Sequence, residues 1–187
     1  IIGGRTLKAS ISSPSSVDAT ETVTITYGAA HHLHIASAAS GIANRIAFTN
    51  QPAIEVRDIS GNVVGNSTAQ ISVAATGANG AVLGGDVTRT AISGIAYFAQ
   101  NANGLKLTGS VGDYRLTYSS GSLSADSQDV TLAHGTATKI VVSRNAASAK
   151  SGQAFGTQPK IQVQDADSNL VNTGVAATAQ VRMAVSS

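Results

Sequence analysis

Residues 51–58 read Gln-Pro-Ala-Ile-Glu-Val-Arg-Asp, and residues 158–165 read Gln-Pro-Lys-Ile-Gln-Val-Gln-Asp. The two stretches lie 107 residues apart, and the match continues at the same offset to Asn62 and Asn169. Self-similarity at a fixed period indicates repeated structural units, because each copy folds in the same way. The offset therefore predicts copies of one module of about 107 residues.

The repeat divides the chain into three parts. Residues 4–9 resemble residues 112–118 with a small gap, which brings the N-terminus into the same scheme. Residues 1–25 are then the C-terminal strands of a preceding repeat. Residues 26–132 form a complete repeat, and residues 133–187 form the N-terminal half of a following repeat. We expect the chain to be a cut through a longer periodic array.

Within the complete repeat, apolar and polar residues alternate with a period of two. Ile54 and Val56 alternate with Glu55 and Arg57, for example. This pattern is typical of strands with one buried face. Turn residues recur about every ten positions, which favours a β-sandwich. The predicted fold class is all-β, with Ig-like β-sandwich modules in tandem; only the Ala-rich stretch 36–44 is expected to admit a turn of helix.

The turn after residues 51–58 begins with Asp58, whose side chain can accept hydrogen bonds from nearby backbone N–H groups. Gly61 and Asn62 tolerate positive φ. The second copy has Ser168 in place of Gly61. We therefore expect Asn62 and Asn169 to take over part of the left-handed geometry. Ser93-Gly94, between two apolar stretches, predicts a hairpin tip.

Five motifs follow one another along the chain: Gln-Pro at 51–52, Ile-Glu-Val-Arg-Asp at 54–58, Gly-Asn-Val-Val at 61–64, Thr-Ala-Ile-Ser-Gly-Ile-Ala-Tyr-Phe at 90–98 and Gly-Asp-Tyr-Arg-Leu-Thr at 112–117. In this order they resemble bacterial Ig-like repeats of the invasin/intimin kind. The resemblance implies a tandem module of an extracellular protein, on a bacterial cell surface or a virion, that serves as stalk, spacer or adhesive surface. The residues expected to form its structural turns and core are Pro52, Asp58, Gly61, Asn62, Gly94, Phe98, Pro159, Asp165 and Asn169.

Composition argues for a structural part and against a chemical site. The 187 residues include no cysteine, so disulfide scaffolds, zinc ribbons and thiol enzymes are excluded. Twelve basic and ten acidic residues are scattered, so we expect no nucleic-acid partner. The sequence has no run of 18 apolar residues, so we expect no membrane insertion in this segment. Glu21 and Glu55 are the only glutamates, and no pair of acids suggests hydrolysis. We expect no enzyme activity and no cofactor.

Two clusters are weak metal candidates. His32 and His34 share one face of a strand about 6–7 Å apart, a spacing that can chelate a metal. Asp165, Asp167 and Asn169 resemble the first half of a calcium loop, although the downstream ligands are missing. An exposed polar strand face is the preferred explanation of the histidines, because the second copy has Lys139 and Val141 at these positions. Turn chemistry explains both copies of the second cluster, whereas calcium explains only one.

The leading prediction is a non-enzymatic structural or adhesive Ig-like module, acting as a rigid spacer or a fibre subunit. Its partners are other repeats of the same chain or identical neighbouring subunits. In a sharper variant of this prediction, residues 1–25 of one subunit add their strands to residues 133–187 of the next subunit and so complete its half-repeat. The alternative is that the chain is simply cut out of a longer array. A carbohydrate- or receptor-binding module, on a phage virion or cell surface and facing a host glycan or receptor, remains the second function. Tyr27 and Tyr97 are its candidate surface aromatics.

Overall fold

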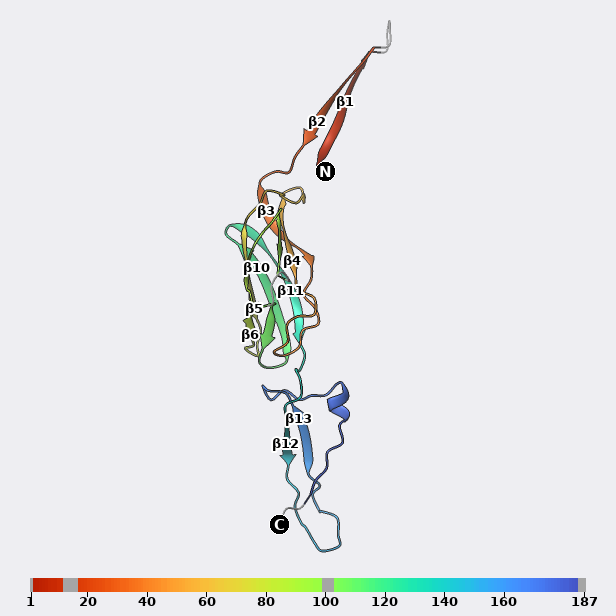
Figure 1. Ribbon diagram of the computed structural model, residues 1–187, viewed down its shortest axis with the longest axis vertical. Helices are drawn as coiled ribbons and strands as arrows, with labels where there is room; N and C mark the ends of the chain where they lie inside the picture. Colours follow the sequence, from red (N-terminus) through yellow and green to blue (C-terminus); the bar gives the residue numbers. More distant parts are fainter. Residues whose placement is uncertain (1, 12–16, 99–102, 185–187) are drawn as a thin grey trace.

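The structure is a computed structural model that describes residues 2–11, 17–98 and 103–184. The chain is elongated: a hairpin stands at one end, a thick body lies in the middle and a smaller β unit lies at the other end (Figure 1). Residues 1 and 12–16 of the first predicted part, 99–102 of the second and 185–187 of the third lie outside the described residues. The boundaries between these parts stay a prediction.

Within the described residues, all regular structure is β-strand except one short 3-10 turn, so the predicted all-β class is confirmed. The strands are β1 (Gly3–Ile11), β2 (Val17–Ile25), β3 (Ala30–Ser37), β4 (Ala53–Asp58), β5 (Gln70–Thr76), β6 (Val82–Gly84), β7 (Thr88–Thr90), β8 (Ile95–Tyr97), β9 (Lys106–Thr108), β10 (Gly112–Ser120), β11 (Leu123–Leu132), β12 (Lys139–Arg144) and β13 (Lys160–Gln164). A 3-10 helix, η1, spans Val175–Thr178. In the described residues, no helix has the length and apolar character needed to cross a membrane.

The central body is a β-sandwich. Seven strands are ordered β7-β5-β10-β11-β3-β4-β8, and β6 pairs with β9 in a separate ribbon. Strands β11 and β3 meet in parallel at a single register pair, Ser124 and His32. The strands before and after this pair are antiparallel. The sheet therefore closes around one core through this narrow connection.

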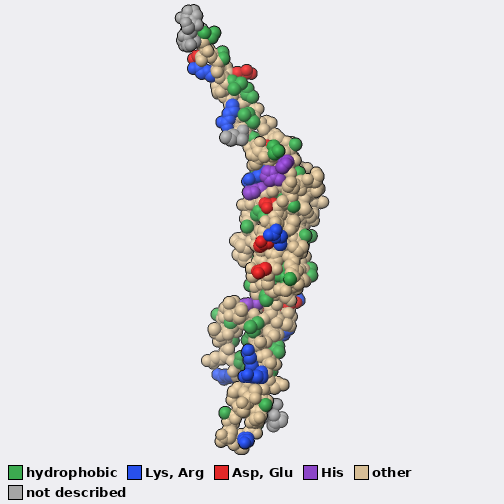
Figure 2. All heavy atoms as spheres, turned by 180° about the vertical axis from the view of Figure 1, so that it is seen from behind, with side chains coloured by type: hydrophobic (Ala, Val, Ile, Leu, Met, Phe, Trp, Pro, Cys, Tyr) green, Lys and Arg blue, Asp and Glu red, His purple; other side chains and the backbone are tan. Residues whose placement is uncertain are grey.

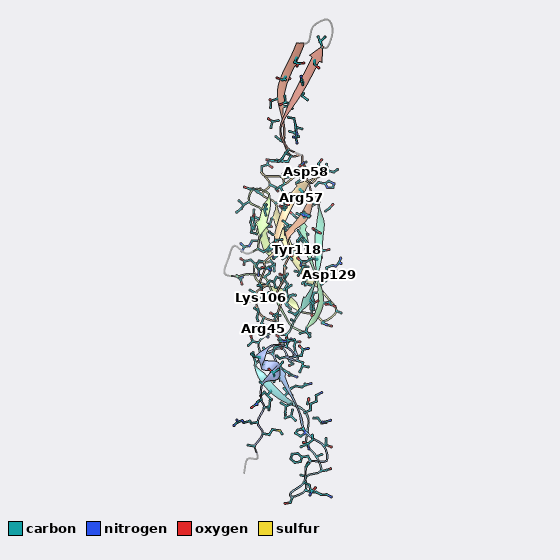
Figure 3. All side chains as sticks on the ribbon, turned by 90° about the vertical axis from the view of Figure 1, so that its right-hand side faces the viewer. Arg45, Arg57, Asp58, Lys106, Tyr118 and Asp129 are labelled. Carbon is teal, nitrogen blue, oxygen red and sulfur yellow. The ribbon has the colours of Figure 1, made fainter. Side chains whose placement is uncertain are left out.

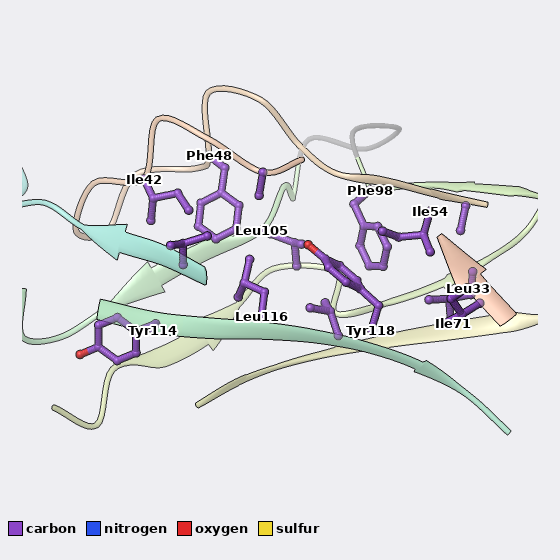
Figure 4. Packing of buried hydrophobic residues seen from close by; sticks show 14 of the residues in the cluster. Leu33, Ile42, Phe48, Ile54, Ile71, Phe98, Leu105, Tyr114, Leu116 and Tyr118 are labelled. Carbon is purple, nitrogen blue, oxygen red and sulfur yellow. The ribbon is translucent and has the colours of Figure 1, made fainter. Parts of the chain in front are cut away.

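The core lies between β10 and the segments opposite it (Figure 4). Leu116 and Tyr118 of β10 are fully buried, as are Ile54 and Phe98. The rings of Phe98 and Tyr118 lie 6.1 Å apart at a tilted angle, an arrangement that aromatic pairs favour. The period-two alternation of the sequence thus places one face of each strand in this core.

The expectation of a helical turn within residues 36–44 is wrong. Residues 36–37 end β3, and the rest of the segment is held in irregular form by distant partners. The Ala39 N–H donates to Gln128 Oε1 at 2.8 Å, and the Asn44 N–H donates to the Ala133 carbonyl at 2.9 Å. These bonds satisfy backbone donors that a helix would otherwise pair. Ile42 is buried against the core, so tertiary contacts override the local preference for helix.

The 107-residue offset is present in the backbone. Leu33 pairs with Val56 between β3 and β4, and Ile140 pairs with Val163 between β12 and β13. The Val64 N–H donates to the Val56 carbonyl at 2.9 Å, and the counterpart bond from Val171 to Val163 has the same length. The β12–β13 unit therefore repeats the local geometry of β3–β4.

The β1–β2 hairpin has the same pairing as β10–β11. Gly3 pairs with Ile25 in the first, and Gly112 pairs with Leu132 in the second. Both glycines have positive φ, 116° and 141°, which favours glycine. The register thus matches Gly3 with Gly112, one residue earlier than the sequence comparison that began at Gly4.

Candidate functional site

The Asp58 side chain organises the turn that follows β4. Its Oδ1 accepts the backbone N–H groups of Ser60 and Asn62, each at 2.9 Å. Its Oδ2 accepts the Gly28 N–H at 2.8 Å and the Asn62 side-chain amide at 3.0 Å. Asp58 is buried. One carboxylate therefore ties the end of β4 to the turn and to the segment before β3.

The Asp165 side chain repeats these contacts in the second copy. Its Oδ1 accepts the N–H groups of Asp167 and Asn169 at 3.0 and 2.9 Å. Its Oδ2 accepts the Gly135 N–H at 2.8 Å and the Asn169 side-chain amide at 2.9 Å. A further donor, the Asn44 amide, reaches the same oxygen at 2.8 Å. That extra donor comes from the central body, so this turn also joins two parts of the molecule.

These hydrogen bonds favour the ionised carboxylates. The pKa of Asp58 is held well below its ordinary value, chiefly by the Gly28 N–H and the Asn62 side chain. Burial by itself raises the pKa of Asp165, but the bonds from Asn169, Gly135 and Asn44 outweigh it and lower that pKa strongly. A carboxylate that accepts several N–H bonds stays charged because each donor stabilises the anion.

We call the contact between the central body and the β12–β13 unit the joint. Asn44 lies at its centre and is 2% exposed. The Asn44 amide donates to Asp165 and also to Asp167 Oδ2 at 2.7 Å, while its Oδ1 accepts the Gly109 N–H at 2.9 Å. Beside it, the Arg45 guanidinium forms a bidentate pair with the Asp167 carboxylate, both bonds being 2.7 Å.

Asp167 is held ionised by this pair. The pKa of Asp167 falls to about 2, first because of the hydrogen bond from Arg45 and then because of that from Asn44. Bidentate arginine–carboxylate pairs fix geometry as well as charge. The Arg45–Asp167 pair therefore orients the two units relative to each other.

A second clamp runs from the same turn to another loop of the central body. The Asn169 side-chain amide donates to the Gly109 carbonyl at 2.9 Å, and its Oδ1 accepts the Val111 N–H at 3.0 Å. Figure 3 places Arg45 at the end of the body next to the β12–β13 unit and Asp58 at the opposite end. The two Asp turns thus lie at opposite ends of the central body along the long axis.

Sequence reasoning missed Asn44 and Arg45. The signal that points to them is the change from Ser60 in the first copy to Asp167 in the second. Turn chemistry does not need an acid at that position, because the Ser60 turn forms the same bonds without it. An unexplained acid in a repeat indicates a partner outside the repeat.

The turn residues behave as expected with one exception. Gly61 has φ 80° and Ser168 has φ 69°, so the serine itself adopts the left-handed geometry. The expectation that Asn62 and Asn169 share it is wrong, because both asparagines instead bind the Asp side chain. The Ser93-Gly94 hairpin tip is present, with φ 53° and 80°.

The remaining motif residues lie in different surroundings. Pro52 and Phe98 are fully buried, and the Phe98 N–H donates to the Pro52 carbonyl at 3.1 Å. Pro159, the counterpart of Pro52, is only half-buried at the start of β13. The second copy therefore has the Gln-Pro motif, but its proline is less buried than the proline of the first copy.

The metal candidates are engaged in other contacts in the structure. The oxygens of Asp165 accept N–H donors, and Asp167 is paired with Arg45 and Asn44, so the cluster with Asn169 serves hydrogen bonding. His32 approaches His31, with their Nδ1 atoms 3.3 Å apart. Histidine side chains gather near the hairpin end of the body (Figure 2). Across the residues that the structure describes, no three His, Cys, Asp or Glu side chains are placed to hold a metal ion.

The two aromatic candidates for sugar binding, Tyr27 and Tyr97, differ in how far they are exposed to solvent. Tyr97 is exposed, whereas Tyr27 is half-buried and packs against the core. Within the described part, the two tyrosines do not both present exposed rings for a sugar.

Comparison with known proteins identifies no family: no family model matches the chain, and no curated protein matches it. Similar solved structures include a beta-glycosidase from Bacteroides vulgatus, with a TM-score of 0.42 and 13% identity over 69% of this chain and 17% of that one. Another is a beta-glucuronidase from Parabacteroides merdae, with a TM-score of 0.40 and 11% identity over 69% and 16%. The chain thus spans less than a fifth of these enzymes, and such likenesses indicate neither a shared family nor a shared activity.

Proposed function

We propose that this chain is a non-enzymatic structural module of an extracellular surface or filament protein, in which Ig-like repeats are held end to end as a rigid spacer. The observation that carries the proposal is the joint. Asn44 is almost fully buried there and binds both aspartates of the next unit. A mobile linker would leave such polar groups in water, whereas a fixed joint has to pair them.

The strand order supports Ig-like modules. Strands β3, β4 and β8 are neighbours on one side of the sandwich, and β11, β10, β5 and β7 are neighbours on the other. With the β6–β9 ribbon left out, β3, β4 and β8 are the first, second and fifth strands and face β5, β10 and β11, the third, sixth and seventh, as in an Ig-like sandwich. The fourth strand, β7, lies beside β5 in the second layer. The repeated Asp58 and Asp165 turns support a tandem arrangement.

Two separate clamps support rigidity. A single contact would still allow the units to swivel, but the turn that holds Asp165 and Asn169 contacts two different loops of the central body, at Asn44 and at Gly109. The Arg45–Asp167 pair adds a planar, charge-assisted contact. Bending or twisting at the joint would break several of these bonds together, so one orientation is favoured.

The first prediction concerns this orientation. The chain has no cysteine, so Ala125→Cys and Lys160→Cys provide two unique sites for spin labels on exposed positions of β11 and β13. We expect one narrow distance distribution by pulsed electron paramagnetic resonance. Asp167→Ser installs the residue of the first copy and removes the Arg45 pair, and Asn44→Ala removes the central contact; both should broaden the distribution.

The matched control is Asp129→Ser. Asp129 forms a bidentate pair with Arg115 of similar geometry, but within the β10–β11 hairpin. Its loss should leave the distance distribution narrow. A distribution that is already broad in the labelled parent chain would contradict the rigid spacer, whatever the variants do.

A further inference from the structure

The β1–β2 hairpin exposes the positions that β10–β11 buries. Leu7 corresponds to Leu116 in the pairing register, yet Leu7 is 58% exposed and Leu116 is fully buried. Ile25 corresponds to Leu132 and is likewise exposed where its counterpart is buried. Hydrophobic side chains are visible along the hairpin in Figure 2. The hairpin therefore carries a core face without a core.

The β12–β13 unit exposes the complementary positions. Phe155 corresponds to Phe48 at the 107-residue offset, and it is 42% exposed where Phe48 is 3% exposed. Ile140 corresponds to Leu33 and is also exposed. A groove on this unit is lined by Ile140 of β12, Val163 of β13 and Val181. This half of a sandwich thus lacks the layer that covers it in the central body.

We infer that the β1–β2 hairpin of one copy binds the β12–β13 unit of a second copy, in the place that β10–β11 takes beside β3–β4. This inference rests on the proposed function, since it names the partner of the spacer. The central body already contains the strand pairing that this contact would repeat, since β11 pairs in parallel with β3 at Ser124 and His32. By the repeat, Val17 of the donor and Lys139 of the acceptor form the counterpart pair.

The hairpin does not meet the β12–β13 unit of its own chain. The two lie at opposite ends of the elongated molecule, with the central body between them (Figure 1). In the 187-residue chain, the pairing therefore joins two copies. Because donor and acceptor surfaces differ, the contact is head-to-tail and extends into an open filament.

One acidic position of the hairpin suits the same pairing. Strands β12 and β13 carry Lys139, Arg144 and Lys160 and no acidic residue. On the hairpin, Arg5 and Lys8 balance Asp18 and Glu21, and Asp18 already pairs with Lys8 at 2.8 Å, which leaves Glu21 to face the basic strands. Glu21 corresponds to Gln128, whose Oε1 accepts the Ala39 N–H at 2.8 Å. A carboxylate at that position can accept the corresponding backbone bond and also faces a basic unit.

The hairpin of one copy and the β12–β13 unit of a second copy together form a composite module, which is smaller than the central body. Residues 81–109, which include β6–β9, have no counterpart in residues 1–25 or 133–187. The composite consequently lacks the counterparts of Leu105 and Leu107, which are fully buried in the central body. Less apolar surface is buried, so we expect a concentration-dependent association and not a permanent one.

The test uses a disulfide at the inferred register. The full chain with Val17→Cys and Lys139→Cys should form a ladder of linked multimers under mild oxidation, because the two sites meet only between copies. The control pairs Val17→Cys with Thr131→Cys, an exposed position on the central body. A ladder equally strong in the control, or none in the test pair, would overturn the inference.

A second measurement uses sedimentation velocity over a concentration series. Leu7→Asp places a charge on the inferred contact face and should weaken self-association at least about tenfold. Thr6→Asp lies on the opposite face of the same strand and should leave it unchanged. A chain that stays monomeric at about 100 μM but keeps a narrow spin-label distance distribution overturns the pairing and leaves the rigid spacer standing. A chain that assembles but has a broad distance distribution overturns the rigid spacer and leaves the pairing standing.

Discussion

A single carboxylate organises the turn that follows the Gln-Pro motif in each of the two sequence copies. Asp58 and Asp165 each accept N–H groups from their own turn and one from the glycine that precedes the first strand of the copy. Removing such an acceptor leaves several donors without partners, and each buried one is costly. The aspartate is therefore a structural requirement of the repeat.

The second prediction tests Asp58 by an isosteric change. Asp58→Asn keeps the shape but replaces one accepting oxygen by an NH2 group, which faces N–H donors. We expect the melting temperature of the central body to fall by about 5 °C or more, measured by circular dichroism. Asp129→Asn, in an exposed ion pair, should change it little. Equal effects of the two substitutions would contradict the role given to Asp58.

The turns at Gly61 and Gly94 differ in how much space they leave for a side chain. Gly61 and Gly94 both have φ 80°. A Cβ on Gly61 would meet nothing within 4 Å, whereas a Cβ on Gly94 would lie 2.5 Å from the Val64 carbonyl oxygen. The backbone cost of a side chain is thus similar at the two turns, but the steric cost is not.

The third prediction compares these glycines. Gly61→Ala should lower the free energy of unfolding by about 1 kcal/mol, the cost of a left-handed alanine. Gly94→Ala should lower it by about 3 kcal/mol or more, because the hairpin tip has to move away from Val64. Urea unfolding of both variants gives the difference. Similar losses would show that the tip yields without strain.

At the scale of the whole molecule, the proposed rigidity of the joint depends on a charged pair, Arg45 and Asp167. Asp167 has a pKa of about 2, below its ordinary value near 4. A lowered carboxylate pKa means that its contribution is complete above the ordinary value and is lost as the pH falls through the folded value. The joint therefore weakens in acid.

The fourth prediction follows from that direction. The spin-label distance distribution should stay narrow from pH 7 to about 5 and broaden between about pH 4 and pH 2 as Asp167 is protonated. Asp167→Ser should be broad throughout and respond less to acid. Circular dichroism of the same samples checks that the central body persists, since the pKa of Asp58 lies lower still. An unchanged parent distribution at pH 2 would exclude this source of rigidity.

The sequence by itself determined the all-β class, the 107-residue offset and the Asp turns. These features are local: a period-two pattern, a fixed spacing and a carboxylate that binds N–H groups a few residues away can be read along the chain. The motif also led to Asp165, Asp167 and Asn169, although it left open what they bind.

Only the tertiary structure decided the rest. Asn44 meets Asp165 across 121 positions, and no local pattern encodes so distant a contact. Distant hydrogen bonds likewise keep residues 36–44 from forming a helical turn. The match between Gly3 and Gly112 required the strand register, because a one-residue slip changes which face each side chain occupies. The physical reason is common to all three: burial and long-range pairing select among conformations that the local sequence permits.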